Sequence, residues 1–313
     1  MSGADRERLE ANPNLFLKTV IKEYVKSSPE NRLPTYDNEP IVEEPLVGFA
    51  DGNDPIFQDF KKETIIGEFH FTPEEALSTY LKRQKKNAGE KKASPLSVVS
   101  IVFTATKKTR LSNRPESVMA SSRWQYAFGR GITFMENTLQ HLVSILEALG
   151  YQAVAPIYTK PVLFLWLLPG GPTSDWSEKH IAYAAGLGTF GLNSGLITSK
   201  GAAVLCGSMI TGLAFTPTPR AYDNYQAYCL HYRNGSCKRC VQRCPSGALS
   251  EQGYDRRKCF FYHEVDLPRI SKALGREPEG GHPPVCSLCQ TKVPCESMIP
   301  PDTSAKNQQE HKS

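Results

Sequence analysis

The sequence predicts two domains of different character: an α+β main domain and, after it, a small domain rich in cysteine. Over residues 61–220, segments whose apolar residues have helical spacing alternate with short runs rich in β-branched residues. Eight of the nine cysteines lie after Tyr228. The chain has 313 residues, which is enough for two domains and a sizeable hydrophobic core.

The predicted domain boundaries follow changes in composition. Residues 1–60 are expected to form an N-terminal arm, because a helical segment is followed by the proline-rich and acidic stretch SPENRLPTYDNEPIVEEP. The main domain is expected over residues 61–220 and the cysteine-rich domain over residues 221–300. A polar tail follows over residues 301–313.

Three helices of the main domain have local signals. Thr72 is a favoured N-cap residue before the helical stretch PEEALSTYLKRQKK. Residues 134–150 have apolar side chains at helical spacing and end in glycine, a stop signal. A further helix is expected over residues 174–186, with Ser174 or Asp175 as its N-cap.

Strand signals come from short apolar runs. Residues 96–105, LSVVSIVFTA, are typical of a buried strand. Residues 151–158 and 162–168 are expected to be strands or extended segments. Residues 194–213 are expected to form a hairpin that closes near Lys200–Gly201.

Charge and hydropathy do not by themselves indicate a nucleic-acid or membrane protein. The net charge is +5, and the one basic cluster, Lys82 to Lys92, is typical of a solvated surface. Docking of RNA or of an acidic electron donor is the alternative role for that cluster. The longest apolar run, VLFLWLL, is too short to cross a bilayer, and the first residues lack the apolar core of a secretory signal. We therefore expect a cytoplasmic protein without a membrane partner.

The stretch NGSCKRCVQRCPSGAL, residues 234–249, has a spacing typical of iron–sulfur ligands. Bacterial ferredoxins carry C-x2-C-x2-C-x3-C-P, whose first three cysteines hold one cubane cluster while the fourth serves a second cluster. Asn234 stands where the first cysteine would be, and Cys229 is the nearest substitute. Downstream, CSLCQTKVPC supplies three more cysteines in an altered second half-motif.

Eight cysteines suffice for two [4Fe–4S] clusters, and each half of a ferredoxin sends its last cysteine to the other half's cluster. The first cluster is then expected on four thiolates: Cys229, Cys237, Cys240 and Cys295. The second is expected on the other four: Cys244, Cys259, Cys286 and Cys289. Cys206 lies in an apolar run and is expected to be a small buried residue.

Other uses of these cysteines stay open at this point. Two four-cysteine zinc sites fit the C-x2-C pairs, and a single cluster with a degraded second site fits the altered spacings. A disulfide scaffold would require an oxidising compartment, which nothing in the sequence indicates.

The segment GLGTFG, Gly186–Gly191, matches the G-x-G-x-x-G pattern of dinucleotide sites. That pattern must follow a strand and open a helix, with an acid about twenty residues further on. Here it follows a helical pattern and the acid is absent near Thr211, so we reject dinucleotide binding. Closely spaced glycines let a backbone approach a flat ligand, and the alternative is a helix C-cap followed by a bulged turn.

Three stretches precede the cysteines in order: SSRWQYAFGRG, EKHIAYAAGLGTFGLNSGLIT and GSMITGL. Together with the cysteine cluster they resemble the cobalamin-dependent iron–sulfur reductase family, which contains epoxyqueuosine reductase and the reductive dehalogenases. The resemblance extends from about Ser94 to Cys295.

The resemblance implies a nitroreductase-like α+β domain that holds a corrinoid (cobalamin), followed by a bacterial two-[4Fe–4S] ferredoxin-like domain. Electrons from an external donor, flavodoxin or ferredoxin, would pass through the clusters to cobalt. They would drive reductive cleavage of a small-molecule or modified-nucleoside substrate, while the protein places and tunes the cofactor. The residues expected to hold the corrinoid are Ser122, Arg123, Gly129, Gly186, Gly188, Gly191 and Asn193. None of the histidines stands in an Asp-x-His-x-x-Gly pattern, so no protein ligand to cobalt is expected.

A reductive cleavage also needs protons, which a tyrosine or an acid near the cofactor can supply. Tyr126, Asp175 and His180 are the catalytic candidates, with Tyr183 as a further one. Each has a structural alternative: core packing for the tyrosines, helix capping for Asp175 and a helix hydrogen bond for His180. Two functional alternatives stay open, namely a ferredoxin-type electron-transfer protein and a protein that reduces a corrinoid without an organic substrate of its own.

Overall fold

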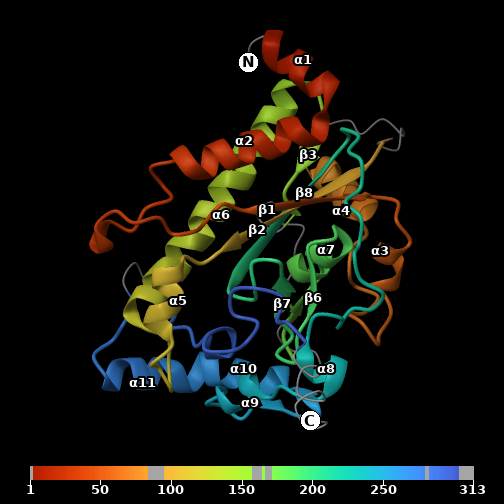
Figure 1. The fold of residues 1–313 in the computed structure, drawn as a ribbon. Coiled ribbons are helices and arrows are strands. Elements are labelled where there is room, and N and C mark those ends of the chain that lie inside the picture. Colours follow the sequence, from red (N-terminus) through yellow and green to blue (C-terminus); the bar gives the residue numbers. More distant parts are fainter. Residues whose placement is uncertain (1–2, 84–94, 157–163, 166–170, 279–281, 303–313) are drawn as a thin grey trace, which may run out of the picture.

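A four-stranded antiparallel sheet forms the centre of the main domain (Figure 1). In this computed structural model the described residues are 3–83, 95–156, 164–165, 171–278 and 282–302. The strand order is β1-β2-β8-β3. The bounds are Leu46–Asp51 for β1, Ser97–Thr104 for β2, Val204–Thr211 for β8 and Ala153–Val154 for β3. The strand expected over residues 96–105 is confirmed as β2.

Strand β2 is buried on both of its faces along its whole length. Successive side chains of a strand point to opposite faces of the sheet. Val99, Ile101 and Phe103 belong to one hydrophobic core, whereas Val98 belongs to another. Helices therefore cover both faces of the sheet, and the main domain has three layers.

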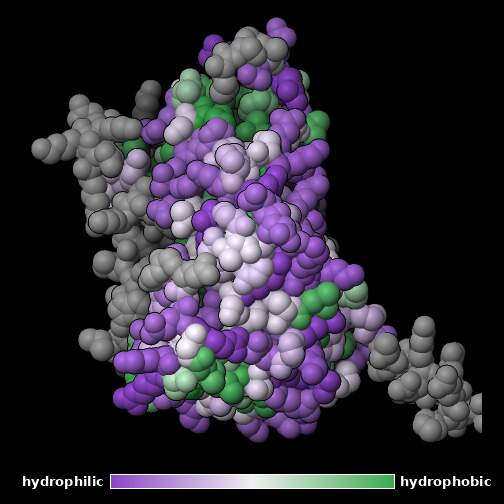
Figure 2. Space-filling model, turned by 90° about the vertical axis from the view of Figure 1, so that its left-hand side faces the viewer, coloured by the Kyte–Doolittle hydropathy of each residue, from purple (hydrophilic) through white to green (hydrophobic). Residues whose placement is uncertain are grey.

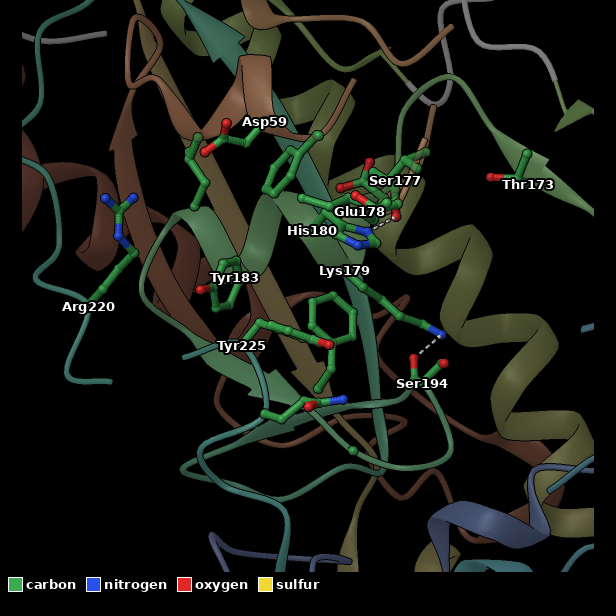
Figure 3. Close-up of a pocket in the computed structure, with 18 of the residues that line it drawn as sticks. Asp59, Thr173, Ser177, Glu178, Lys179, His180, Tyr183, Ser194, Arg220 and Tyr225 are labelled. Atoms are coloured by element: carbon green, nitrogen blue, oxygen red, sulfur yellow. Dashed lines mark hydrogen bonds between the residues drawn. The ribbon is translucent and has the colours of Figure 1, made fainter. Parts of the chain in front are cut away.

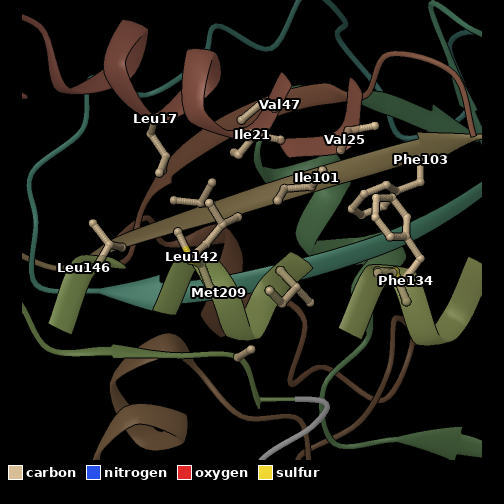
Figure 4. Close-up of a cluster of buried hydrophobic side chains, with 14 of the residues drawn as sticks. Leu17, Ile21, Val25, Val47, Ile101, Phe103, Phe134, Leu142, Leu146 and Met209 are labelled. Atoms are coloured by element: carbon tan, nitrogen blue, oxygen red, sulfur yellow. The ribbon is translucent and has the colours of Figure 1, made fainter. Parts of the chain in front are cut away.

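The first layer consists of α2 (Pro13–Ser27) and α6 (Ser122–Ala148). Figure 4 shows Leu17 and Ile21 of α2 and Leu142 of α6 among the buried side chains that pack beside the strands. The helix predicted over residues 134–150 is thus the second half of a longer helix.

Residues 1–60 belong to this core, which corrects the expectation of a separate N-terminal arm. Strand β1 pairs with β2 along its whole length, from Leu46 opposite Val102 to Asp51 opposite Ser97. Helix α2 buries one apolar face against the sheet, as amphipathic helices do. The boundary expected at residue 60 therefore does not separate two structural units.

The opposite face is covered by α3 (Ile56–Asp59), α4 (Pro73–Arg83) and α7 (Glu178–Ala184). The predicted cap of α4 is confirmed. Thr72 Oγ1 accepts a hydrogen bond from the Glu75 amide at 3.3 Å, and Glu75 Oε2 accepts one from the Thr72 amide at 2.8 Å. Reciprocal bonds of this kind form a capping box.

The start of α7 differs from the prediction. The residue that precedes the helix is Ser177, not Ser174 or Asp175. Ser174 instead lies in a short strand, β5 (Thr173–Ser174), which pairs with β4 (Phe164–Leu165). The extended pairing holds this segment out of the helix.

The hairpin expected over residues 194–213 is also corrected. Strand β7 (Leu196–Thr198) pairs with β6 (Gly188–Phe190), whereas β8 pairs with β2 and β3 in the central sheet. The chain does turn tightly there, because Thr198 and Gly201 form an isolated bridge. However, β8 pairs with β2 along its whole length and with β3 at Ile210 and Thr211, whereas β7 pairs with β6.

The C-terminal domain consists of short elements around the cysteines, gathered at the lower end of Figure 1. They are α8 (Leu230–Asn234), α9 (Arg239–Gln242), β9 (Leu249–Ser250), β10 (Gly253–Tyr254), α10 (Arg256–Phe261), the π-helical turn η3 (Tyr262–Asp266), α11 (Leu267–Ala273) and the 3-10 turn η5 (Leu288–Gln290). The remaining elements of the chain described here are α1 (Gly3–Ala11), the 3-10 turn η1 (Pro34–Tyr36) and α5 (Lys107–Asn113).

Two arginines join the C-terminal domain to the main domain. The Arg243 guanidinium donates to the backbone carbonyls of Glu116 at 2.6 Å and of Asn113 at 3.2 Å. Arg114 forms a forked pair with the buried carboxylate of Glu296, at 3.0 Å from Nε and 2.9 Å from Nη2. Breaking a buried pair leaves an unpaired charge, so these contacts hold the two domains in one orientation.

Some expectations fall outside the described residues: most of the basic cluster Lys82–Lys92, most of the apolar run 162–168, and nearly all of the tail. None of the helices within the described ranges combines the length and the apolar character that crossing a bilayer requires. Figure 2 shows the side near α5 and α11, which is largely hydrophilic with small hydrophobic areas near its lower end. Leu111 of α5 and Leu274 after α11 are among the exposed apolar side chains.

Candidate active site

The cysteines of the C-terminal domain lie in two groups. In the first, Cys229 is buried and packs in one apolar cluster with Cys240 and Cys295. Cys237, Cys229 and Cys240 all act electrostatically on the Cys295 thiol, so the four cysteines lie in one region of the fold. Burial raises the pKa of Cys240 to about 12.

The second group is assembled in the same way. Cys289, Cys259 and Cys244 act on the Cys286 thiol, and burial raises the pKa of Cys289 to about 11. A buried thiol resists ionisation, and a metal is what converts it to a bound thiolate. The two groups have the same members as the two predicted ligand sets, while ligation itself stays a prediction.

Asn234 and Cys206 lie apart from both groups. The Asn234 side chain donates to Asp302 Oδ1 at 2.8 Å and accepts from the Ser236 amide at 3.0 Å, so both ends of its amide are engaged. Cys206 lies half-buried in β8, where burial raises its pKa to about 12. Within the described ranges, no three His, Cys, Asp or Glu side chains stand close enough to share a single metal ion.

A cavity of about 1700 Å³ lies beside α7 and reaches the C-terminal domain (Figure 3). Pockets for drug-sized ligands measure about 300–1,000 Å³, so this cavity has room for a considerably larger molecule. Its wall combines aromatic and polar side chains. The polar and aromatic residues of the wall include Ser177, Lys179, His180, Tyr183, Ser194, Arg220, Tyr225, Tyr232, Tyr254 and Arg256.

The cavity touches both cysteine groups. Tyr254 lines it and is hydrogen-bonded to the Cys259 thiol of the second group. Leu192 lines it as well and packs with Cys229 of the first group. Asn193 adds a third link, because its Nδ2 donates to the Cys289 carbonyl at 3.0 Å. A redox centre in either group would therefore lie one side chain from the cavity.

A chain of hydrogen bonds supports one wall. The Ser177 amide donates to His70 Nε2 at 3.0 Å, and the Ser177 hydroxyl lies 2.8 Å from His180 Nδ1. His180 also packs against the rings of Phe60 and Phe190, at 5.2 and 4.6 Å between centroids. Burial lowers the pKa of His70 to about 4 and that of His180 to about 3, so both imidazoles are neutral at physiological pH.

Glu178 is the first residue of α7 and is buried against β8. Burial raises its pKa to about 8, an effect that the neighbouring Ser208 only partly offsets. Neither carboxyl oxygen has a hydrogen-bond partner within the described part of the chain. Glu178 is among the residues that line the cavity, although both of its carboxyl oxygens are shielded from solvent.

Tyr183 and Arg220 also line the cavity (Figure 3). The Tyr183 ring stacks on Tyr222 at 5.1 Å between centroids, and the Tyr222 hydroxyl donates to the Tyr183 carbonyl. Burial raises the pKa of Tyr183, whereas the charge of Arg220 lowers it. Arg220 is itself held by Asp54, with 2.8 Å between Nη1 and Oδ2.

The structure brings together only part of the predicted site. His180 and Gly191 line the cavity, and Asn193 lies directly beside it. Asp175 is buried at the start of this wall but does not line the cavity. Its backbone carbonyl accepts a hydrogen bond from the Phe71 amide at 2.9 Å.

The predicted residues on α6 do not line the cavity. Arg123 pairs with Glu39 and lies over the Tyr36 ring, 4.9 Å from its centroid. Tyr126 packs beside the same Tyr36 at 6.0 Å. The start of α6 therefore binds the N-terminal segment, and the expectation that it also faces a corrinoid stays a prediction. Ser122 is exposed at the first turn of this helix.

The glycines of the candidate site have a packing reason. A Cβ on Gly188 would lie 2.3 Å from the Ile197 carbonyl oxygen, and one on Gly129 would lie 2.4 Å from the His282 ring. Gly186 follows α7 with φ +76, a left-handed conformation that glycine adopts without strain. At Gly186 and Gly188, the alternative of a helix cap followed by a turn accounts for what the structure shows.

The sequence alone did not indicate several residues that line the cavity, chiefly Arg220, Tyr222 and Tyr254. They lie in segments without helical or strand periodicity, so no pattern placed them near α7. The one available signal is the density of tyrosines just before Cys229, in PRAYDNYQAYC.

Comparison with known proteins finds sequence similarity to epoxyqueuosine reductases. The chain is 35% identical over 177 residues to a protein of Gloeobacter violaceus, covering 54% of this chain and 48% of the other. It is 28% identical over 201 residues to one of Listeria monocytogenes, covering 64% and 48%. Both are epoxyqueuosine reductases. The chain spans about half the length of these curated relatives. No protein-family model matches it.

Solved structures of epoxyqueuosine reductases and of a reductive dehalogenase are also similar to the chain. An epoxyqueuosine reductase crystallised with a tRNA-Tyr epoxyqueuosine-modified stem loop is 19% identical with a TM-score of 0.46, over 92% of this chain and 70% of the other. A catabolic reductive dehalogenase is 13% identical with a TM-score of 0.40, over 81% and 34%. The sequence relatives, rather than these structures, carry the relationship.

Proposed function

We propose that the chain is a corrinoid-dependent iron–sulfur oxidoreductase that cleaves a bond of its substrate reductively. The observation that carries this proposal is one large cavity whose lining residues Tyr254 and Leu192 contact two groups of cysteines. The sequence relatives, all epoxyqueuosine reductases, favour a modified nucleoside as the substrate. We place the reaction in the cytoplasm, where reducing conditions keep thiols free.

Two [4Fe–4S] clusters fit the cysteine groups. Cubane clusters are held by four thiolates each, and each group supplies four thiols with a largely apolar surround. Tyr254 interacts with the Cys259 thiol of the second group, and the Asn193 side chain donates to the backbone carbonyl of Cys289. Hydrogen bonds to the sulfurs are one of the means by which proteins set a cluster's reduction potential.

The cavity fits a corrinoid in its size and in its polar lining. Ser177, Ser194 and Lys179 offer short polar contacts for amide side chains, and Tyr225 offers an aromatic surface. The corrinoid, when bound, would supply a metal centre that delivers electrons to the substrate. Of the predicted contacts, Gly191 and Asn193 remain in the proposed site, whereas the α6 residues are replaced by the wall around Ser177 and His180.

Tyr183 is the proton donor in this proposal. It lines the cavity, and its raised pKa keeps the phenol protonated at neutral pH. The positive charge of Arg220 would stabilise the phenolate that remains after the proton has left. Reduction of an epoxide to an alkene and water consumes two electrons and two protons, so a donor beside the substrate is needed. His180 stays neutral and fixes one side of the cavity.

Conversion of an epoxyqueuosine-modified stem loop tests the proposal. Anaerobically reconstituted protein with cobalamin and reduced flavodoxin should remove one oxygen atom from the nucleoside, followed by mass spectrometry. Tyr183→Phe should lower turnover by about 10²–10⁴-fold. Tyr126→Phe, which lies outside the cavity, is the matched control and should keep wild-type turnover. If clusters and corrinoid are bound but neither this stem loop nor an aryl halide is consumed, the chain is an electron-transfer or corrinoid-reducing protein instead.

A further inference from the structure

We infer that α8 and α9 form the docking surface for an acidic one-electron carrier protein. The surface consists of the outer side of residues 230–243 together with Lys292. It rests on the proposed function only in requiring an iron–sulfur cluster in the first cysteine group.

Basic residues are frequent in this region. Residues 224–250 contain four Arg or Lys and no Asp or Glu, a charge of +4. The segment that carries the first cysteine group is therefore basic, as is the segment Lys82–Lys92.

Three of these four cations are exposed to solvent. Arg233, Lys238 and Arg239 are exposed, whereas Arg243 is turned inward to the backbone of the main domain. The Arg239 guanidinium donates to the Gln242 side chain at 3.0 Å. Exposed Lys292 lies beyond η5, which packs on α9.

The two ion pairs at the edge of this surface do not cancel its charge. Lys238 lies 2.6 Å from Glu251, and Arg233 lies 3.4 Å from Asp302. Both pairs are partly or largely exposed, where an ion pair contributes little and its members can take new partners.

The surface also has an exposed aromatic side chain. Tyr232 is 42% exposed and lies at the border with the cavity, which it also lines. Aromatic residues, methionine and arginine are the types enriched in protein–protein interfaces. Cations around an apolar centre fit a partner with acidic residues around its own redox group.

The surface lies directly over the first cysteine group. Helix α8 begins immediately after Cys229, and α9 contains Cys240. Both helices lie at the lower end of Figure 1, opposite α1 and α2. A carrier docked there would face the cluster across a single short helix and would not need to enter the cavity that takes the substrate.

Stopped-flow reduction of the oxidised clusters by reduced flavodoxin, an acidic carrier, tests the inference on the reconstituted full chain. Opposite charges accelerate association by 10–10³-fold, and salt removes the effect. Arg239→Glu should therefore lower the second-order rate about 10-fold at low salt and converge with wild type at high salt. Lys26→Glu, on α2 at the opposite end, should keep the wild-type rate. Reduction by photoreduced deazaflavin, a small neutral donor, should be equal in all three proteins.

Three outcomes would overturn the inference. They are a flavodoxin rate for Arg239→Glu within twofold of wild type, a wild-type rate that does not respond to salt, and loss of stem-loop RNA affinity in Arg239→Glu with the flavodoxin rate intact. The last would make the surface a nucleic-acid site. Absence of any cluster absorbance in wild-type protein would instead refute the proposed function, so the two failures are distinguishable.

Discussion

Replacing Glu178 with glutamine should flatten the dependence of folding stability on pH between pH 5 and pH 8. Burial between α7 and β8 raises the pKa of this carboxyl from 4.5 to about 8. In this window the folded protein keeps a proton that the unfolded chain releases. The stability that the protonated group contributes is fully present below the unfolded pKa and is lost as the pH rises through the folded pKa.

The size of the effect follows from the two pKa values. One pKa unit corresponds to about 1.36 kcal/mol, and integration from pH 5 to pH 8 gives at most about 3.5 kcal/mol. Glutamine has a similar shape and does not titrate. In a chain of this size 1 kcal/mol shifts Tm by about 2 °C, so Tm of Glu178→Gln relative to wild type should rise by at most about 7 °C over this range.

Thermal unfolding of the reconstituted protein, followed anaerobically by circular dichroism at several pH values, measures this difference. Effects of pH on the cysteine groups are common to both proteins and cancel in the comparison. Glu23→Gln, at an exposed position of α2, is the control and should follow the wild-type curve. A constant offset between Glu178→Gln and wild type at every pH would refute the reasoning, because altered packing alone produces such an offset.

Two further predictions concern single residues. Cys229→Ala should convert the first cluster to a three-iron form seen by electron paramagnetic resonance, whereas Cys206→Ala should leave both clusters intact; the opposite pattern would refute the ligand assignment. Gly188→Ala should lower the free energy of unfolding by about 1–3 kcal/mol in chemical denaturation, because its Cβ would lie 2.3 Å from the Ile197 carbonyl oxygen. Gly212→Ala is the control, since its Cβ would meet nothing nearer than 3.9 Å, and an equal loss in both variants would argue against this contact.

Features with a local cause could be predicted from the sequence. The cap at Thr72 needs only Glu75 three residues later, and β2 is marked by its β-branched run. The two ligand sets followed from cysteine spacing together with the crossed ligation of ferredoxins, and they stay a prediction. In each case the signal lies within a few residues or in a repeated motif.

Features with a distant cause could not be predicted. The composition of residues 1–60 suggests an arm, but β1 finds its partner β2 about fifty residues later. The cavity joins Tyr183 and Arg220 to Tyr254, which share no pattern and meet only in the folded chain. The glycine-rich segment allowed two interpretations, and the contact of Gly188 with the β7 backbone could be recognised only in three dimensions.

The central claim is that two cubane clusters adjoin a corrinoid cavity in one chain. Iron, acid-labile sulfide and cobalt, measured together on protein reconstituted without oxygen, incubated with cobalamin and freed of unbound cofactor, test it most directly. The account predicts about eight irons, about eight sulfides and about one cobalt per chain. Zinc at about two per chain without sulfide would contradict the cluster assignment. A full complement of iron and sulfide with no retained cobalt would contradict the corrinoid site.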